Sequence, residues 1–258
     1  MLAACDRPLD ILFRDAHLVV VNKPAGWLVH RTALDRAETL IVLQALRDQL
    51  GRSVWPLHRL DKGTSGALAF ALDADTAQHM GRQFDVGDGD RIEGVQKTYR
   101  AIVRGWPENE RNIDYPLARM DEDMRTDRKT VQPARTQLRT LRRLTLPLPD
   151  REFADLRLAE LELQPLTGRR HQLRRHMKHI AHPIIGDATH GKGPLNRAVA
   201  AHVGLARLWL HASVLRLHHP EDGRALHVEA PAGAEWQIWR DSAREGRCGP
   251  PAVEPNPP

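Results

Sequence analysis

The stretch HRLDKGTSG, residues 58–66, holds the residue types best suited to chemistry in this chain. Its one acidic residue, Asp61, follows the basic residues His58 and Arg59 and precedes hydroxyl and glycine residues that include Thr64. A carboxylate that an arginine keeps ionised and oriented can act as a nucleophile. The same carboxylate can accept hydrogen bonds inside the turn, and the local sequence alone favours this turn-cap interpretation.

Two residues far from this stretch could take part in the same chemistry. Tyr99 alternates with apolar residues in KTYRAIVRG, so it is either a core aromatic or a ring that stacks on a base and assists proton transfer. Arg174 borders the apolar stripe of Leu173 and Met177 on an expected helix. It is either a surface cation or an arginine that points inward to an acid.

Two other kinds of site are disfavoured by residue order and spacing. The string HRLD resembles the catalytic loop of protein kinases only superficially, because no glycine-rich phosphate loop precedes it and no Asp-Phe-Gly follows. The histidines of residues 171–182 lack the spacing and companion carboxylates of a zinc hydrolase, and nearby arginines repel a cation. We therefore expect no metal.

A basic segment suggests a polyanionic partner. Residues 164–186 contain no acidic residue, and the net charge of the whole chain is +5. The cations of this segment include Arg169, Arg170, Arg174, Arg175 and Lys178. Such a concentrated basic face is expected of a nucleic-acid binder, although a charge run can also be a solvated helix face.

Composition predicts a soluble globular protein of the cytoplasm. Of the 258 residues 41% are hydrophobic and 28% charged, no apolar run is long enough for a membrane, and the N-terminus does not resemble a secretory signal. The two cysteines, Cys5 and Cys248, exclude a disulfide framework and a cysteine zinc site.

The elements that must position these residues mix strands and helices without a regular βαβ rhythm, which predicts an α+β fold. Strands are expected within residues 11–26, 67–73, 97–105, 156–168, 208–220 and 224–231, and helices within 38–51, 75–85 and 169–183. The first half of residues 117–143 is polar and predicts an exposed loop. One domain is expected over residues 1–245, followed by a proline-rich, disordered tail over 246–258.

In this order, the motifs HRLDKGTSG, QKTYRAIVRG, LTGRRHQLRRH, HPIIGD and LWLHAS resemble the RluA-type pseudouridine synthases over roughly residues 11–230. The resemblance implies a mixed, mostly antiparallel sheet with flanking helices and loops around a basic cleft. It implies that Asp61 is catalytic, that Arg174 pairs with it and that Tyr99 packs beside the target uracil. The other substrate- or RNA-binding positions that it implies are His58, Arg59, Thr64, Arg169, Arg170, His171, Gln172 and Leu210.

Within those motifs, Arg59 matches an arginine that enters the RNA where the flipped base has left, and Leu210 matches an apolar residue of the pocket. Lys62 stands where many relatives have arginine, so the charge is kept.

The function that this resemblance implies is isomerisation of uridine to pseudouridine in RNA, without a cofactor. The stretches NKPAGWLVHR and HPIIGDATHGKGPLNR are similar to the branch of the family that modifies uridine 65 of certain tRNAs. Two alternatives are the same reaction on ribosomal RNA and a non-catalytic RNA-binding assembly factor of the same fold. We expect an RNA partner, no membrane association and a monomer.

Overall fold

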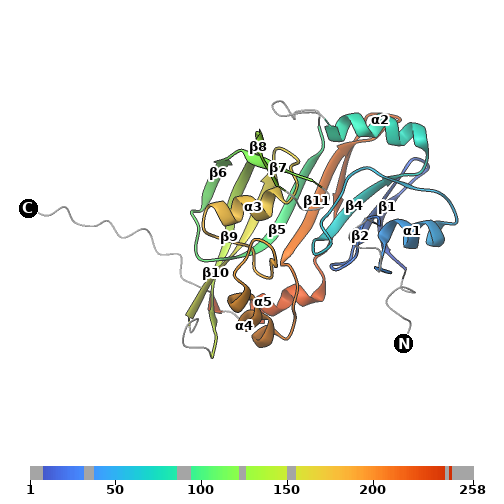
Figure 1. The fold of residues 1–258 in the computed structure, drawn as a ribbon. Helices are drawn as coiled ribbons and strands as arrows, with labels where there is room; N and C mark the ends of the chain where they lie inside the picture. Colours follow the sequence, from blue (N-terminus) through green and yellow to red (C-terminus); the bar gives the residue numbers. More distant parts are fainter. Residues whose placement is uncertain are drawn as a thin grey trace, which may run out of the picture.

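The structure is a computed structural model that describes residues 8–31, 38–85, 94–121, 126–149, 155–241 and 244–245 (Figure 1). Its centre is one large sheet, with helices placed around it. The predicted disordered tail lies outside the described residues, and the boundaries of the predicted domain stay a prediction. Among the described residues, no helix combines the length and the apolar character needed to cross a membrane.

The strands of the large sheet come from all parts of the chain. They are β1 (Asp10–Arg14), β2 (Leu18–Lys23), β3 (Trp55–Pro56), β4 (Ser65–Ala71), β5 (Gln96–Arg104), β6 (Glu110–Asp114), β9 (Arg135–Pro147), β10 (Asp155–Pro165), β11 (Leu210–His218), β12 (Ala225–Glu229) and β13 (Arg244–Glu245). Their order along the main path is β1-β2-β4-β11-β5-β10-β9-β13. The described pairs are antiparallel except β4 with β11, which confirms the predicted mixed, mostly antiparallel sheet.

Strand β11 occupies the middle of the sheet, between β4 and β5 (Figure 1). It pairs with β4 only at its first residues, His211 with Ser65 and Ala212 with Gly66. Gly66 has a φ of +114°, and a Cβ atom there would collide with the backbone of Ala212. A glycine is therefore required where β4 leaves the Asp61 loop and meets β11.

Five helices and a 3₁₀ turn surround the described part of the sheet. They are α1 (Val42–Leu50), α2 (Ala74–Asp85), α3 (Gln172–His179), α4 (Gly193–Val203), the 3₁₀ turn η3 (Ala234–Gln237) and α5 (Ile238–Asp241). Figure 1 shows α2 at one end of the sheet and α4 and α5 near the other.

The helices are held by three buried hydrophobic clusters. Leu46 of α1 and Met177 of α3 share one cluster with strand residues such as Leu68 and Tyr99. A second cluster joins α4 and α5 to β9 and β10 around Trp209. A third cluster joins α2 to β2, β4 and β11. Because alternate residues of β4 enter different clusters, its small residues lie on one side and its large ones on the other, as predicted.

The prediction of an exposed loop in the first half of residues 117–143 is wrong. Strands β7 (Leu117–Met120) and β8 (Thr126–Gln132) pair there as a separate antiparallel ribbon. Residues such as Arg119 and Val131 are exposed on this ribbon. A ribbon that buries little of either face needs no alternation of polar and apolar residues, so the pattern that signals a strand was missing.

Helix α4 and the segment η3–α5 had no sequence prediction. Helix α4 buries Leu195, Val199 and Val203, which recur every four residues on one face. The η3–α5 segment buries Trp236 and Trp239 against Trp209, and it is too short for a helical period to be visible.

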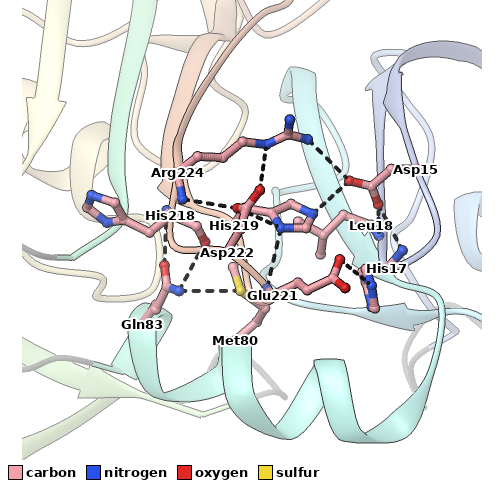
Figure 2. A network of polar contacts seen from close by, with 10 residues as sticks. All are labelled: Asp15, His17, Leu18, Met80, Gln83, His218, His219, Glu221, Asp222 and Arg224. Carbon is pink, nitrogen blue, oxygen red and sulfur yellow. Dashed lines mark hydrogen bonds and ion pairs between the residues drawn. The ribbon is translucent and has the colours of Figure 1, made fainter.

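A polar network ties the β1–β2 turn to the turn after β11 (Figure 2). The His219 imidazole lies between two carboxylates, with Nε2 2.7 Å from Asp15 Oδ2 and Nδ1 3.1 Å from Asp222 Oδ1. Although burial opposes it, hydrogen bonds from two main-chain N–H groups and from His219 lower the pKa of Asp15. Gln83 of α2 exchanges hydrogen bonds with the main chain of His218, so the network also anchors this helix.

Candidate active site

The loop between β3 and β4 carries Asp61. The N–H of Thr64 donates to the main-chain carbonyl of Asp61 at 3.0 Å, which closes a tight turn, and Thr64 is itself buried. The turn is thus closed by the backbone of Asp61, while its carboxylate Oδ2 accepts a hydrogen bond from Arg174 Nη1 at 2.9 Å. The Asp61 carboxylate thus pairs with Arg174, and its catalytic role stays a prediction.

Arg174 joins two carboxylates that come from different parts of the chain. Its Nε and Nη2 donate to the two oxygens of Asp187, both at 2.8 Å, while Nη1 donates to Asp61. Arg174 is buried on α3 with Leu173 and Met177, so its guanidinium points inward, which is one of the two alternatives that the sequence left open. A fork bound on both sides cannot rotate freely, and it therefore fixes the direction of the Asp61 carboxylate.

Asp187 is a site residue that the sequence analysis missed. Its Oδ1 accepts the N–H groups of Thr189 and His190 at 2.9 Å, and its carbonyl accepts Asn196 Nδ2 at 3.0 Å. Although burial opposes it, the hydrogen bonds and charge of Arg174 lower the pKa of Asp187. One signal could have found it, because Asp187 is the first acidic residue after the basic segment 164–186.

A cavity of about 500 Å³ opens over the Asp61 carboxylate. Its walls come from the Asp61 loop, the start of α3, the segment after Ile185 and the segment after β2. The charged and polar side chains that line it are those of His30, Arg59, Asp61, Lys62, Arg170, His171, Arg174, Asp187 and Thr189. Its size is that of a small-molecule site, and its four lysine or arginine side chains outnumber its two carboxylates, which suits a nucleotide unit of a polyanion.

His171 stands beside the Asp61 carboxylate at the N-terminal boundary of α3. Its Nε2 lies 3.8 Å from Asp61 Oδ2, and its Nδ1 lies 3.1 Å from His190 Nε2. Burial lowers the pKa of His171 to about 4, with Arg174 adding to the effect and Asp61 opposing it. His171 has a φ of +52°, an uncommon conformation for a residue with a side chain, so the fold imposes this position at the cavity.

Tyr99 lies behind the Asp61 loop and does not line this cavity. It is on β5, 8% exposed, in the hydrophobic cluster that also holds Leu60 and Leu210. Burial and then the charge of Asp61 raise the pKa of Tyr99 above its ordinary value, so its phenol stays protonated. The structure thus brings Tyr99 near Asp61 as a packed neighbour of the loop.

The other predicted binding residues divide into two groups. Arg59, Arg170 and His171 line the cavity, and Arg59 is exposed. His58, Thr64, Arg169, Gln172 and Leu210 lie outside its lining.

Three of the residues outside the lining have contacts that account for their positions. The His58 ring stacks on Phe84 and its Nε2 accepts the N–H of Ala69. Buried Gln172 hydrogen-bonds Thr136, Thr167 and the main chain of Arg135, and Arg169 Nε donates to the carbonyl of Pro133. These residues hold the loop and the helix that present the cavity.

Lys23, in the stretch NKPAGWLVHR, is a second buried charge that the sequence analysis did not single out. It is fully buried, and its Nζ donates to the carbonyls of Pro24 and Lys62 at 2.9 and 3.2 Å. Burial lowers the pKa of Lys23 to about 7, with the charge of Asp61 opposing the shift. Lys23 therefore ties the end of β2 to the Asp61 loop.

Within the part of the chain that the structure describes, no three His, Cys, Asp or Glu residues form a group that could hold a metal ion.

Comparisons with known proteins agree on one family. A family model described as RNA pseudouridylate synthase matches residues 17–179. The tRNA pseudouridine synthase C of Yersinia pestis is 46% identical over 234 residues, which cover 89% of this chain and 88% of that protein. The tRNA pseudouridine synthase C of Vibrio cholerae is 46% identical over 233 residues, which cover 89% and 93%.

Solved structures agree with this result. Human RNA Pseudouridylate Synthase Domain Containing 1 is 26% identical, with a TM-score of 0.67 over 90% of this chain and 86% of that one. Human RNA Pseudouridylate Synthase Domain Containing 4 is 27% identical, with a TM-score of 0.63 over 90% and 93%.

Proposed function

Because this chain belongs to the RNA pseudouridylate synthase family, we propose that it isomerises a uridine of tRNA to pseudouridine, with Asp61 as the catalytic carboxylate. The observation that carries the proposal is the Asp61 carboxylate, held by Arg174 at the base of a basic cavity the size of a nucleotide.

The reaction replaces the carbon–nitrogen bond between ribose and uracil by a carbon–carbon bond. The bond from ribose C1′ to N1 of the uracil breaks, the base turns, and C1′ bonds to C5. C5 then loses a proton and N1 gains one, so the atoms balance and no oxidant, reductant or water is consumed. Chemistry of this kind needs an anion that attacks, or stabilises positive charge at, the sugar or the base.

Asp61 meets this requirement because its surroundings hold its carboxylate in a fixed direction beside a cation. Arg174 supplies a permanent positive charge and a direct hydrogen bond to Asp61 Oδ2, and Asp187 holds Arg174 from the other side. Tyr99 supports the loop from behind. Its stacking on the uracil and its help in proton transfer stay predictions, since it lies outside the lining of the cavity.

The uridine must leave the RNA stack to reach Asp61, at a cost of roughly a few kcal/mol. Arg59, Arg170 and Lys62 at the cavity would offset this cost through contacts to the phosphates on either side of the flipped nucleotide. Exposed Arg59 is well placed to fill the space that the base leaves, as the resemblance implies.

The relatives named tRNA pseudouridine synthase C support tRNA over ribosomal RNA as the substrate, and uridine 65 is the position we propose. A non-catalytic assembly factor would have no need for the buried Arg174–Asp187 pair that orients Asp61. A monomeric state and a cytoplasmic location stay predictions.

Replacing Asp61 by Asn tests the proposal. We expect Asp61→Asn to lose turnover while its affinity for tRNA stays within about threefold, since phosphate contacts dominate binding. The measurement is pseudouridine formation by the purified protein on tRNA from a strain that lacks the gene. Chemical mapping of tRNA and ribosomal RNA from this strain and its parent gives the position. Wild-type turnover in Asp61→Asn would refute the catalytic role, and loss of a ribosomal site alone would refute the substrate.

A further inference from the structure

A stacked and exposed aromatic pair lies at the far end of α3 from the cavity. The rings of Tyr115 and His179 face each other with centroids 3.5 Å apart and planes 17° from parallel. Tyr115 is one of the two tyrosines of the chain, and in contrast to buried Tyr99 it is 41% exposed. His179, the last residue of α3, is also exposed. An aromatic ring held at the surface retains a face or edge for another ring.

The pair is held in place through the main chain of Tyr115, in the short segment between β6 and β7. The N–H of Tyr115 donates to the carbonyl of Ala134 at 3.1 Å. Its carbonyl lies 2.9 Å from Nε2 of His176, which is fully buried one turn before His179. The ring of Tyr115 is therefore positioned before any partner arrives, which reduces the entropy lost on binding.

Basic residues lie on the elements that carry the pair or adjoin it. Arg175 Nη2 donates to the carbonyl of Ala118, and its charge interacts electrostatically with Tyr115. Lys178 and Arg119 are exposed on α3 and β7, Asp114 precedes Tyr115, and Asp127 lies opposite Arg119 in the β7–β8 ribbon. An exposed ring on elements that carry Arg175, Lys178 and Arg119 suits a nucleic acid, which offers a base to stack and phosphates to neutralise.

The pair is also close enough to the cavity to contact the same RNA. Arg174, which holds Asp61, and His179 are five positions apart on α3, so their main chains are about 8 Å apart along the helix axis. Phosphates of one nucleic-acid strand in a helix follow each other about every 3.4 Å along its axis. An RNA with its uridine in the cavity can therefore reach the pair with a base only a few nucleotides away.

We propose that Tyr115 and His179 form a stacking platform that binds a base of the RNA substrate outside the reaction cavity. This inference rests on the proposed function for its substrate, an RNA. The platform adds affinity and register without taking part in the bond rearrangement, because it contacts nucleotides other than the reacting one.

Binding measured in the Asp61→Asn background tests the platform separately from turnover. The probe is end-labelled tRNA from a strain lacking the gene, and the readout is fluorescence anisotropy. Stacking on one ring predicts that Tyr115→Leu raises Kd about tenfold, whereas Tyr115→Phe, which keeps the ring, stays within about twofold. His179→Ala should weaken binding by a smaller factor. His202→Ala is the matched control, because His202 is an exposed histidine in the last turn of α4.

Turnover by the same substitutions in the otherwise wild-type protein separates the platform from the chemistry. We expect Tyr115→Leu to raise KM by about the same tenfold and to leave kcat within about twofold. Photocrosslinking of tRNA that contains 4-thiouridine should give a peptide that includes Tyr115.

Three results would overturn the platform. An unchanged Kd in Tyr115→Leu is one, and would point to a protein partner for this surface. Equal losses in Tyr115→Phe and Tyr115→Leu are another, since the ring would then not matter. A loss in Tyr115→Leu that coincides with a lower melting temperature, while His179→Ala binds normally, would make the effect one of folding. Absence of pseudouridine formation by the wild type would refute the proposed function while leaving the binding result intact.

Discussion

At the scale of single residues, the arrangement depends on Arg174 more than on any local feature of the Asp61 loop. One guanidinium uses three nitrogens to hold two carboxylates, and the second, Asp187, is almost completely buried. A buried ion pair is costly to assemble, and costlier still when one partner is removed. Asp187 is therefore a positioning residue, which acts on Asp61 through Arg174.

Removing the Asp187 carboxylate should harm both stability and turnover. We expect Asp187→Ala to lower the free energy of unfolding by about 3 kcal/mol or more, because Arg174 stays buried with one of its two partners gone. Asp155→Ala, at an exposed carboxylate, is the control and should change it by less than about 0.5 kcal/mol. Urea unfolding measures both variants. Equal midpoints for Asp187→Ala and wild type would show that Arg174 does not depend on Asp187.

At the scale of elements, the junction between β4 and β11 places the Asp61 loop against the centre of the sheet. The two strands pair over only two residue pairs, and the close approach there depends on the missing side chain of Gly66. A local change at this junction therefore displaces the Asp61 loop, which directly precedes β4.

Alanine substitutions at two glycines should change the free energy of unfolding in opposite directions. Gly66→Ala combines a φ of +114° with a collision against Ala212, and we expect it to lower the free energy of unfolding by about 3 kcal/mol or more. Gly81→Ala is the matched control. Gly81 lies inside α2 with open space around it, and alanine there should raise stability by up to about 1 kcal/mol. Thermal unfolding compares them, and similar melting temperatures for the two variants would contradict this account.

The sequence predicts elements well where buried side chains follow a regular period and poorly where burial is slight. The large side chains of the strand with Leu68 and Phe70 pack in one cluster and its alanines in another, and the apolar side of the helix with Leu173 and Met177 packs in one cluster, so both elements show a regular period. The β7–β8 ribbon buries few side chains, so its sequence pattern predicts a loop. In the site, the pairing of Asp61 with Arg174 came from the resemblance to a family. For Asp187 the sequence offers only its place directly after the basic segment 164–186, because its pairing with Arg174 is visible only in the tertiary structure.

At the scale of the whole molecule, the fold buries several histidines in their neutral form. The pKa values of five histidines are lowered, mainly by burial; they are His58, His171, His176, His190 and His211. The hydrogen bonds of His211 are those of a neutral imidazole. The two ring nitrogens of His211 face the Ser65 hydroxyl and the carbonyl of Ala230, so one nitrogen accepts and the other donates.

These histidines should make the protein sensitive to mild acid. Below pH 6.5 the unfolded chain binds protons at histidines where the folded chain does not. The free energy of unfolding therefore decreases as the pH decreases. Each fully buried ring contributes up to about 1.4 kcal/mol per pH unit. The lowered pKa values of Asp15 and Asp187 act only below about pH 4, outside this window. The urea midpoint should therefore drop between pH 7 and pH 5. His211→Asn should reduce this drop, and a midpoint that is the same at both pH values would contradict the explanation.

The central place of β11 has a consequence for synthesis on the ribosome. About a hundred residues separate the end of β5 from the start of β11, and translation covers them in roughly 5 to 20 seconds. During this interval the nascent chain holds β4 and β5 with open edges, which are sites for wrong pairing. A ribosome that stops before residue 210 leaves a chain whose sheet lacks the strand between them. The centre of the sheet therefore cannot be completed until β11 has been synthesised.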